Sequence, residues 1–449
     1  MKIRLPHNYV PRDYQLPAWT YMERDMENLR AVAVWHRRAG KDLFGINLVA
    51  VKHLQRVGMY WHLLPTYKQG RAIIWNGFTR EGRKFLDYFP RELVADKNMA
   101  EMRITFTNGS MYQVVGTDDV DTLVGTNPVG CIFSEYSLQD PSAWDYLRPI
   151  LVENGGWALF IYTARGKNHG WRMLEMAKKN PKWFHEVLVA GDKGTRREDG
   201  TPVISDRQIQ DERDAGMPEE MIQQEFFCSF EAPLVGSYYG KLMARLEMEK
   251  RLRTVPWEPK LNVHTAWDFG IDDETVIWFV QEYGGEVRVI DFYKNSGEGL
   301  GHYAKLLRGQ VEGYERMGDY LYGKHYAPHD IEVRELTSGK SRREAAKEMG
   351  IKFKIVGRHE IEDGIEAVRM LLPQCYFDEG HCEYGIEALK CYRKEWDEQR
   401  KTFRTNPLHD WASHAADAFR IYAWGRKAEG YGTKKERQAR AIDDYNYLG

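Results

Sequence analysis

The sequence predicts an α/β protein of two domains, the first built on a mainly parallel sheet and the second on a mixed sheet. At 449 residues the chain is longer than one hydrophobic core usually supports. In the first half, short apolar runs alternate with stretches suited to helices, which is typical of a parallel sheet covered on both faces. In the second half, two strand-like runs joined by a Gly-Gly turn follow an earlier strand, which indicates antiparallel neighbours.

The composition is that of a globular protein, with 43% hydrophobic and 29% charged residues and a net charge of −2. No apolar stretch is long enough for a membrane span and the first residues resemble no secretory signal, so we expect a cytoplasmic protein. Five scattered cysteines favour free thiols in a reducing compartment over disulfides or a zinc site. With so little net charge, any contact with nucleic acid must come from local patches.

Residues 29–35 form a mainly apolar run that predicts a buried strand, and an apolar helical stretch begins at residue 43. Between them lie Arg37, Arg38, Gly40 and Lys41. Strand, basic turn, Gly-Lys and helix is the layout of a phosphate-binding loop, in which N–H groups at a helix N-terminus point at an anion. Gly40 lets the backbone come close, Lys41 reaches the β- and γ-phosphates, and the arginines add positive charge.

This loop departs from the GxxxxGK[ST] pattern at two positions, with Trp35 in place of glycine and Asp42 in place of serine or threonine. We expect Asp42 to bind Mg²⁺ through its carboxylate, directly or through water. The alternative is an ordinary helix start with a solvated lysine. Upstream, Gln15 and a neighbouring aromatic either hold an adenine or belong to a surface arm, and the segment alone favours the arm.

Further apolar runs at 59–64, 130–133 and 157–162 predict strands, and an Asn-Gly turn at 108–109 predicts a hairpin. Ligands of such a sheet bind at the carboxyl ends of its strands, so we expect Lys41, Glu135 and Thr163 to converge. ATP hydrolysis needs a carboxylate that orients or deprotonates water, and Glu135 is placed for this role. Ser134 stands where such strands usually carry an aspartate, so Asp42 is the better metal partner. The alternative is that Glu135 only starts a helix.

The segments WHRRAGKD, LLPTYKQGR, GCIFSEYSLQDPSAWDYLRPIL and FIYTARGKNHGW, in this order, resemble the large terminase subunit of tailed bacteriophages. The resemblance implies a DNA-packaging ATPase with a C-terminal nuclease. It assigns phosphate binding to Lys41, the catalytic carboxylate to Glu135, and coupling of hydrolysis to movement to Thr163 and Arg165. Ser134 departs from the family's usual aspartate.

The same resemblance implies ATP and Mg²⁺ as cofactors of the ATPase and two Mg²⁺ or Mn²⁺ ions for the nuclease. It implies double-stranded DNA, the small terminase subunit and the portal protein of the procapsid as partners, a homo-oligomeric ring on the portal, and a site of action in the host-cell cytoplasm. The expected organisation is a P-loop ATPase domain at 1–190, a linker or subdomain at 191–256, a nuclease domain at 257–426 and a basic tail at 427–449, with the boundary near Pro256.

The second half reads as a strand with Asp268 near its end, two antiparallel strands, a helix, a strand followed by Asp330, and further helices and strands. This order suggests a ribonuclease-H-like nuclease fold, in which Asp268 and Asp330 sit on adjacent parallel strands. A C-terminal helix would add a third acid, and three carboxylates can hold two divalent ions that clamp the reacting oxygens of a phosphodiester. Asp272, Asp273 and Asp291 are auxiliary candidates.

On that helix, Asp410, His414 and Asp417 are spaced by four and then three residues, which places them on one face. Asp417 lies where the terminase family keeps its last acid and is the expected third metal ligand. His414 either binds metal, a phosphate or the attacking water, or is a buried histidine bonded to Asp410. Asp410 is also suited to capping the helix.

Three other functions remain open at this stage. A helicase-like ATPase with an unrelated C-terminal domain would not cleave DNA in Mg²⁺ or Mn²⁺, and a ribonuclease-H-like recombinase would lack ATPase activity. A non-enzymatic scaffold is disfavoured because the acids and the Gly-Lys pair fall at strand ends. The basic segment 426–440 contacts DNA or the portal, or is a solvated end, and the second is favoured.

Overall fold

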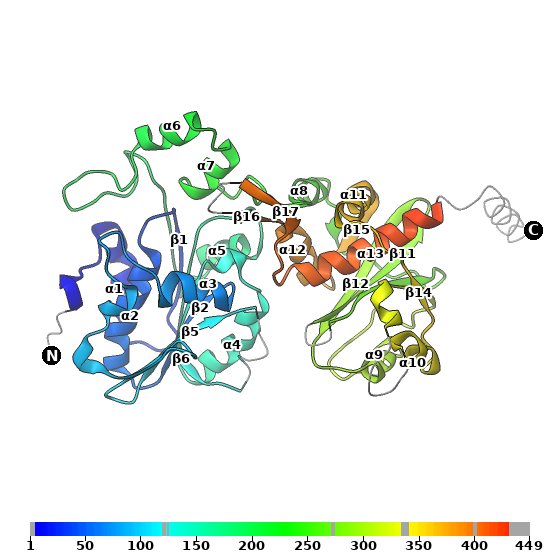
Figure 1. Cartoon of the computed structure of the whole chain (residues 1–449), viewed down its shortest axis with the longest axis horizontal. Coiled ribbons are helices and arrows are strands. Elements are labelled where there is room, and N and C mark those ends of the chain that lie inside the picture. Colours follow the sequence, from blue (N-terminus) through cyan, green and yellow to red (C-terminus); the bar gives the residue numbers. More distant parts are fainter. Residues whose placement is uncertain are drawn as a thin grey trace, which may run out of the picture. The chain divides into compact units, whose positions relative to one another are not determined.

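The computed structural model describes residues 5–118, 123, 125–270, 274–333, 341–397 and 402–430. The chain forms two compact units, Met1–Val235 and Gly236–Gly449, and both are α/β (Figure 1). The division lies earlier than the boundary predicted near Pro256, because the chain after residue 236 already joins the second sheet: β9 (Leu252–Arg253) pairs with β15 (Cys375–Asp378). The segment 191–235, predicted as part of a linker or subdomain, belongs to the first unit.

The first unit contains one sheet in the order β3-β4-β5-β2-β6-β7-β1-β8. From β5 to β8 every neighbouring pair is parallel, whereas β4 is antiparallel to both of its neighbours, β3 and β5. The mainly parallel sheet is therefore confirmed, as is the hairpin at the Asn-Gly turn. The strands are β1 (Arg30–Trp35), β2 (Met59–Leu64), β3 (Val94–Asn98), β4 (Arg103–Phe106), β5 (Met111–Gly116), β6 (Pro128–Ser134), β7 (Trp157–Tyr162) and β8 (Phe184–Leu188).

Helices cover both faces of this sheet. Alternate residues of β1 point to opposite faces: Ala33 and Trp35 join the apolar cluster of α1 and α2, while Val32 and Val34 join that of α4 and α5. This two-sided burial explains why the strands read as continuous apolar runs. The helices are α1 (Leu16–Glu23), α2 (Lys41–Gln55), α3 (Tyr67–Gly70), α4 (Ser142–Glu153), α5 (His169–Lys179), α6 (Asp206–Asp214) and α7 (Glu219–Glu225).

The second unit contains a mixed sheet in the order β14-β13-β10-β11-β12-β15-β9 and a separate pair, β16-β17. β11 is antiparallel to both β10 and β12, as the Gly-Gly turn predicts, while β10 runs parallel to β13. The remaining strands are β10 (Val263–Asp268), β11 (Thr275–Tyr283), β12 (Glu286–Asn295), β13 (Tyr322–Ala327), β14 (Phe353–Ile355), β16 (Lys394–Asp397) and β17 (Thr402–Pro407).

The long helix α13, near the red end of the chain in Figure 1, packs along β10, β11 and β13 and contains the predicted C-terminal acid Asp417. The indole N–H of Trp278 on β11 donates to the carbonyl of Ala415 at 2.8 Å, which fixes the helix against the sheet. The helices of this unit are α8 (Gly240–Met248), α9 (Leu300–Leu307), α10 (Arg342–Glu348), α11 (Ile361–Leu371), α12 (Glu383–Cys391) and α13 (Ser413–Gly430).

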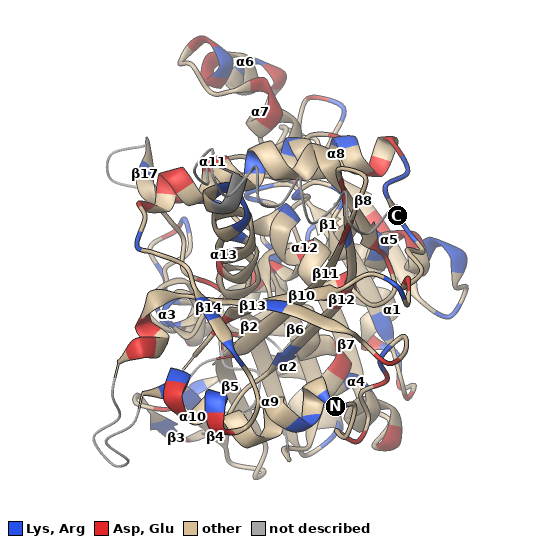
Figure 2. Ribbon diagram, turned by 90° about the vertical axis from the view of Figure 1, so that its right-hand side faces the viewer, with Lys and Arg blue, Asp and Glu red and all other residues tan. Residues whose placement is uncertain are grey.

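Charged positions of both signs are interspersed along the chain, and α6 carries both acidic and basic residues (Figure 2). This distribution accords with the small net charge of the whole chain. Among the helices of the described ranges, none combines the length and the apolar character needed to cross a membrane.

Candidate functional site

The loop between β1 and α2 is shaped by Gly40. Its φ of 82° lies in the left-handed region, and it forms the N-cap of α2. A Cβ at this position would also lie 3.1 Å from the side-chain nitrogen of Gln15. Both constraints favour glycine immediately before the lysine that begins the helix.

Lys41 is buried at the carboxyl ends of three strands. Its ammonium donates to the Thr163 hydroxyl at 2.6 Å and to the Trp35 carbonyl at 3.2 Å, and it lies 3.1 Å from Oε1 of Glu135. Trp35 ends β1, Glu135 follows β6 and Thr163 follows β7. The expected convergence of Lys41, Glu135 and Thr163 is thus present in the structure.

Glu135 has a left-handed backbone, with φ at 55°, which is uncommon for a residue other than glycine. This conformation turns its side chain toward Lys41, and its Oε2 accepts the Thr163 N–H at 3.4 Å. Glu135 precedes a short 3₁₀ helix, but its side chain forms no cap hydrogen bond there. The geometry therefore speaks against the alternative in which Glu135 only starts a helix.

Asp42 lies beside the end of β6, where the Ser134 hydroxyl donates to its Oδ1 at 2.5 Å. The imidazole Nε2 of the fully buried His62, on β2, lies 3.4 Å from the same oxygen. Burial raises the pKa of Asp42, but the hydrogen bond and charge of His62, the Ser134 hydroxyl and the Lys41 charge outweigh it and leave that pKa below its usual value. Asp42 is thereby held as a carboxylate. No pattern in the sequence indicated His62.

Gln15 is buried, and its amide N–H donates to the Ala39 carbonyl at 2.8 Å. The Tyr14 hydroxyl donates to the same carbonyl at 3.1 Å and receives a hydrogen bond from Arg12. The view of this segment as a surface arm is therefore wrong, because its polar side chains hold the phosphate-binding loop.

The two arginines of the loop lie in different surroundings. The Arg37 N–H donates to the Glu225 carbonyl at 2.8 Å, and its guanidinium lies 3.9 Å from the Glu225 carboxylate, whereas Arg38 is exposed with a left-handed φ of 73°. Arg165 donates to the Glu225 carboxylate at 2.5 Å. Glu225 thus connects the loop to the predicted coupling segment. The sequence analysis assigned Glu225 no role in the site.

In the second unit, Asp268 ends β10 and its Oδ2 lies 2.9 Å from Nδ1 of His414 on α13. Asp417, one turn further along, bonds to Arg420 at 3.0 Å. Burial, together with the negative charge of Asp268, raises the pKa of Asp417 to about 6 despite Arg420. The structure therefore places Asp268 and His414 in direct contact, and Asp417 lies near enough for its charge to interact with both.

Asp330 is the fourth, and it lies exposed just beyond the end of β13. Because β13 runs parallel to β10, Asp330 and Asp268 follow the carboxyl ends of neighbouring strands. The described residues contain no group of three or more His, Cys, Asp or Glu side chains placed closely enough to hold a metal ion. Asp268 and Asp330 therefore share a sheet edge without forming a closed ligand set.

A curated relative supports the resemblance stated above. The large terminase subunit of Escherichia phage T5 is 22% identical over 417 residues, which cover 87% of this chain and 85% of that protein. The likeness to large terminase subunits is confirmed. No protein-family model matches the chain.

Solved structures of large terminases are also similar to this chain. The large terminase of a thermophilic bacteriophage, in complex with ATP-gamma-S, matches over 92% of this chain and 98% of its own, at 16% identity and a TM-score of 0.37. The ATPase domain of the Thermus phage P74-26 large terminase matches over 49% of this chain and 94% of its own, at 20% identity and a TM-score of 0.38. The large terminase nuclease of phage G20c with bound magnesium matches over 42% of this chain and 98% of its own, at 13% identity and a TM-score of 0.31.

Two expectations about acidic residues of the second unit are wrong. Asp410 precedes α13 and so does not share its face with His414 and Asp417. Its carboxylate accepts the Ala412 N–H at 3.1 Å and pairs with Arg393 at 2.9 Å. His414 consequently bonds to Asp268 and not to Asp410. Asp291 is buried and accepts the hydroxyls of Tyr314 and Tyr320, and burial raises its pKa, so it is no exposed metal ligand. Asp272, Asp273 and residues 431–449 lie outside the described residues.

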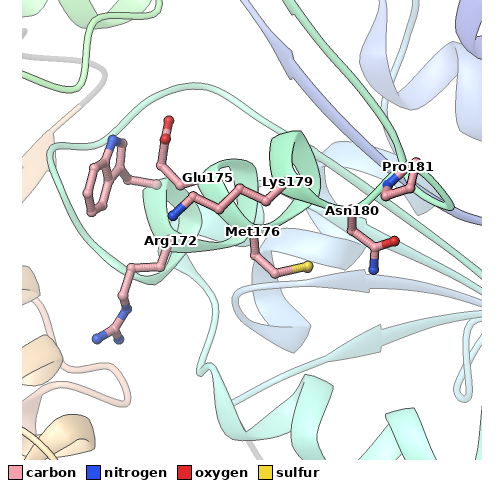
Figure 3. A pocket seen from close by; sticks show the side chains of 7 residues that line it. Arg172, Glu175, Met176, Lys179, Asn180 and Pro181 are labelled. Atoms are coloured by element: carbon pink, nitrogen blue, oxygen red, sulfur yellow. The ribbon is translucent and has the colours of Figure 1, made fainter.

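A groove on α5 is distinct from both candidate sites. It is lined by residues of that helix and the turn after it, including Arg172, Glu175 and Lys179 (Figure 3). None of the predicted site residues lines it. Its mixed charge and open shape give no reason to assign it a ligand.

Proposed function

We propose that the chain is the large subunit of a viral DNA-packaging terminase, which uses ATP to move double-stranded DNA into a procapsid and cuts concatemeric DNA with a metal-dependent nuclease. The observation that carries the proposal is the contact of Lys41 with Glu135 and Thr163. These residues come from three of the segments that resemble terminase motifs, and they meet where a parallel sheet binds ligands.

In the proposed ATPase, the N-terminus of α2 and Lys41 bind the β- and γ-phosphates, as Gly40 allows the backbone to approach. Gln15 supports the loop, and Arg37 and Arg38 add positive charge. Asp42 is a fitting ligand for Mg²⁺, because it is ionised and only 22% exposed. Bound Mg²⁺ would neutralise charge on the phosphate oxygens. Glu135 orients or deprotonates the attacking water.

In the proposed nuclease, Asp268, Asp330, Asp417 and His414 hold two Mg²⁺ or Mn²⁺ ions, which would clamp the attacking and leaving oxygens of the phosphodiester. Burial is the main cause of the raised pKa of Asp417 and the negative charge of Asp268 adds to it, and a bound cation would offset both. Asp330 must approach Asp268 for the set to close, and its exposed position beyond β13 leaves it free of core packing.

Coupling of hydrolysis to movement is assigned to Thr163 and Arg165. Thr163 contacts the phosphate-binding Lys41, and Arg165 pairs with Glu225, the last residue of α7. A structural change at the nucleotide would therefore be transmitted to α7 through these contacts. The proposed partners are double-stranded DNA, the small terminase subunit and the portal protein, on which copies of this chain form a ring in the host cytoplasm.

The decisive experiment measures ATPase activity and plasmid cleavage on the same purified protein, each with and without EDTA. We expect both activities, and we expect EDTA to abolish both. ATPase activity without cleavage in Mg²⁺ or Mn²⁺ would favour a helicase-like ATPase. Cleavage without ATPase activity would favour a ribonuclease-H-like recombinase.

A further inference from the structure

The two polar positions that usually hold Mg²⁺ in phosphate-loop ATPases are both altered in this chain. In such sites a serine or threonine hydroxyl follows the loop lysine, and an aspartate at the end of a neighbouring strand supplies the negative charge. Here Asp42 follows Lys41, and Ser134 ends β6. Each position carries the chemical group that the other usually provides.

The two altered side chains are in direct contact. The Ser134 hydroxyl donates to Oδ1 of Asp42 at 2.5 Å, although 92 residues separate them in sequence. Ser134 is fully buried, whereas the Asp42 side chain remains 22% exposed. One carboxylate and one hydroxyl therefore meet between the loop and β6, and the charge of the pair equals that of the usual arrangement.

Two buried polar side chains, His62 on β2 and Tyr112 on β5, lie behind Asp42. His62 on β2 is fully buried, and its Nε2 lies 3.4 Å from Asp42 Oδ1, while its Nδ1 lies 3.0 Å from the Tyr112 hydroxyl. Burial, and then the Asp42 charge, raise the pKa of Tyr112 well above its usual value.

We propose that the carboxylate and the hydroxyl of the Mg²⁺ site have exchanged places between the phosphate loop and β6, so that Asp42 supplies the charged ligand and Ser134 the hydroxyl. The inference rests on the proposed ATPase function and adds the ligand set. Its consequence is that the two positions are coupled: restoring the usual arrangement requires both changes together.

The test is a double-mutant cycle on the full chain with Asp42→Ser, Ser134→Asp and the double variant. A fluorescent, non-hydrolysable ATP analogue is titrated with Mg²⁺ at equilibrium, so the readout is binding and not turnover. Asp42→Ser should raise the Mg²⁺ concentration for half-maximal binding by roughly 10- to 100-fold, the scale on which metal sites respond to altered ligation. The Mg²⁺ concentration for half-maximal binding of the double variant should lie within about threefold of the wild-type value, a much smaller change than that range.

Ser134→Asp alone places two carboxylates at hydrogen-bond distance, so its melting temperature should fall in EDTA and recover in Mg²⁺. Asp42→Asn, which keeps the side-chain shape, should reproduce the loss seen with Asp42→Ser if the latter does not fold. Asp211→Ser, at an exposed position of α6, is the matched control and should bind as the wild type.

If the wild type binds the analogue in Mg²⁺ but the double variant is no better than Asp42→Ser, the exchange is overturned while the ATPase proposal stands. Unchanged Mg²⁺ dependence in both Asp42→Ser and Asp42→Asn also overturns it. If the wild type binds no nucleotide at any Mg²⁺ concentration, the proposed ATPase function falls and the exchange falls with it.

Discussion

Replacement of Glu135 by glutamine should stop ATP turnover while it leaves nucleotide binding and the fold in place. Glutamine has the shape of glutamate, so its amide oxygen can still accept the Thr163 N–H. Lys41 keeps two other partners, the Thr163 hydroxyl at 2.6 Å and the Trp35 carbonyl at 3.2 Å. The substitution therefore removes one negative charge and leaves the local packing nearly unchanged.

The expected effects on stability and on rate differ in size. The Glu135 side chain is 26% exposed, so solvent screens its pair with Lys41, and its loss should cost about 1 kcal/mol or less of unfolding free energy. Removal of the carboxylate that orients or deprotonates water should lower the hydrolysis rate by about 10²-fold or more. That factor corresponds to about 2.7 kcal/mol of activation free energy.

The assay combines single-turnover ATP hydrolysis, equilibrium binding of a nucleotide analogue and thermal melting. The matched control is Glu153→Gln, at an exposed position near the end of α4, which should leave all three unchanged. If Glu135→Gln hydrolyses ATP at the wild-type rate, the catalytic role belongs to another carboxylate. The next candidates are Asp42 and Asp119, and Asp119 lies outside the described residues.

Lys41→Ala should remove ATP hydrolysis but leave plasmid cleavage largely intact, because the acidic site lies in the other unit; loss of cleavage in a folded variant would contradict the two-site proposal. Asp417→Ala should abolish cleavage and His414→Ala should impair it, with ATPase activity retained, and a metal-soaked crystal with Asp417 turned away from bound ions would refute this assignment. Asp410→Ala should mainly lower the free energy of unfolding in denaturant melts, by about 3 kcal/mol, because it breaks a buried ion pair; an unchanged midpoint would argue against that role. Burial raises the pKa of Glu186 from 4.5 to about 7. Between these pH values the Glu186 carboxyl is protonated in the folded state and ionised in the unfolded state. The free energy of unfolding should therefore fall as the pH rises through this window, and Glu186→Gln should flatten that fall in thermal melts recorded from pH 4.5 to 7.5; parallel curves would refute the linkage.

Much of the nucleotide site could be predicted because its signals are local. The apolar run before Arg37, the Gly40-Lys41 pair and the helical stretch after it lie within a few residues of one another. The convergence of Lys41 with Glu135 required only one further rule, that parallel strands share their carboxyl edge. That prediction did not depend on the order of the strands within the sheet.

The acidic residues of the second unit show where local patterns fail. The spacing of Asp410, His414 and Asp417 fits one face of a helix, but α13 begins only at Ser413. Asp410 lies before the helix and pairs with Arg393, a partner that no periodicity indicates. Asp291 looked like a further ligand in sequence, and only the fold reveals that two tyrosines enclose it.

The sequence by itself determined the α/β class, the loop that begins at the end of β1 and the carboxylates at strand ends, because each depends on hydrophobic periodicity and turn chemistry within a short window. The tertiary structure alone decided which side chains meet. Asp42 and Ser134 are 92 residues apart, Arg165 and Glu225 are 60 apart, and Asp268 and His414 are 146 apart. Such pairs form because strand order and helix docking bring distant segments to one edge of a sheet, and that order is set by the packing of the whole domain.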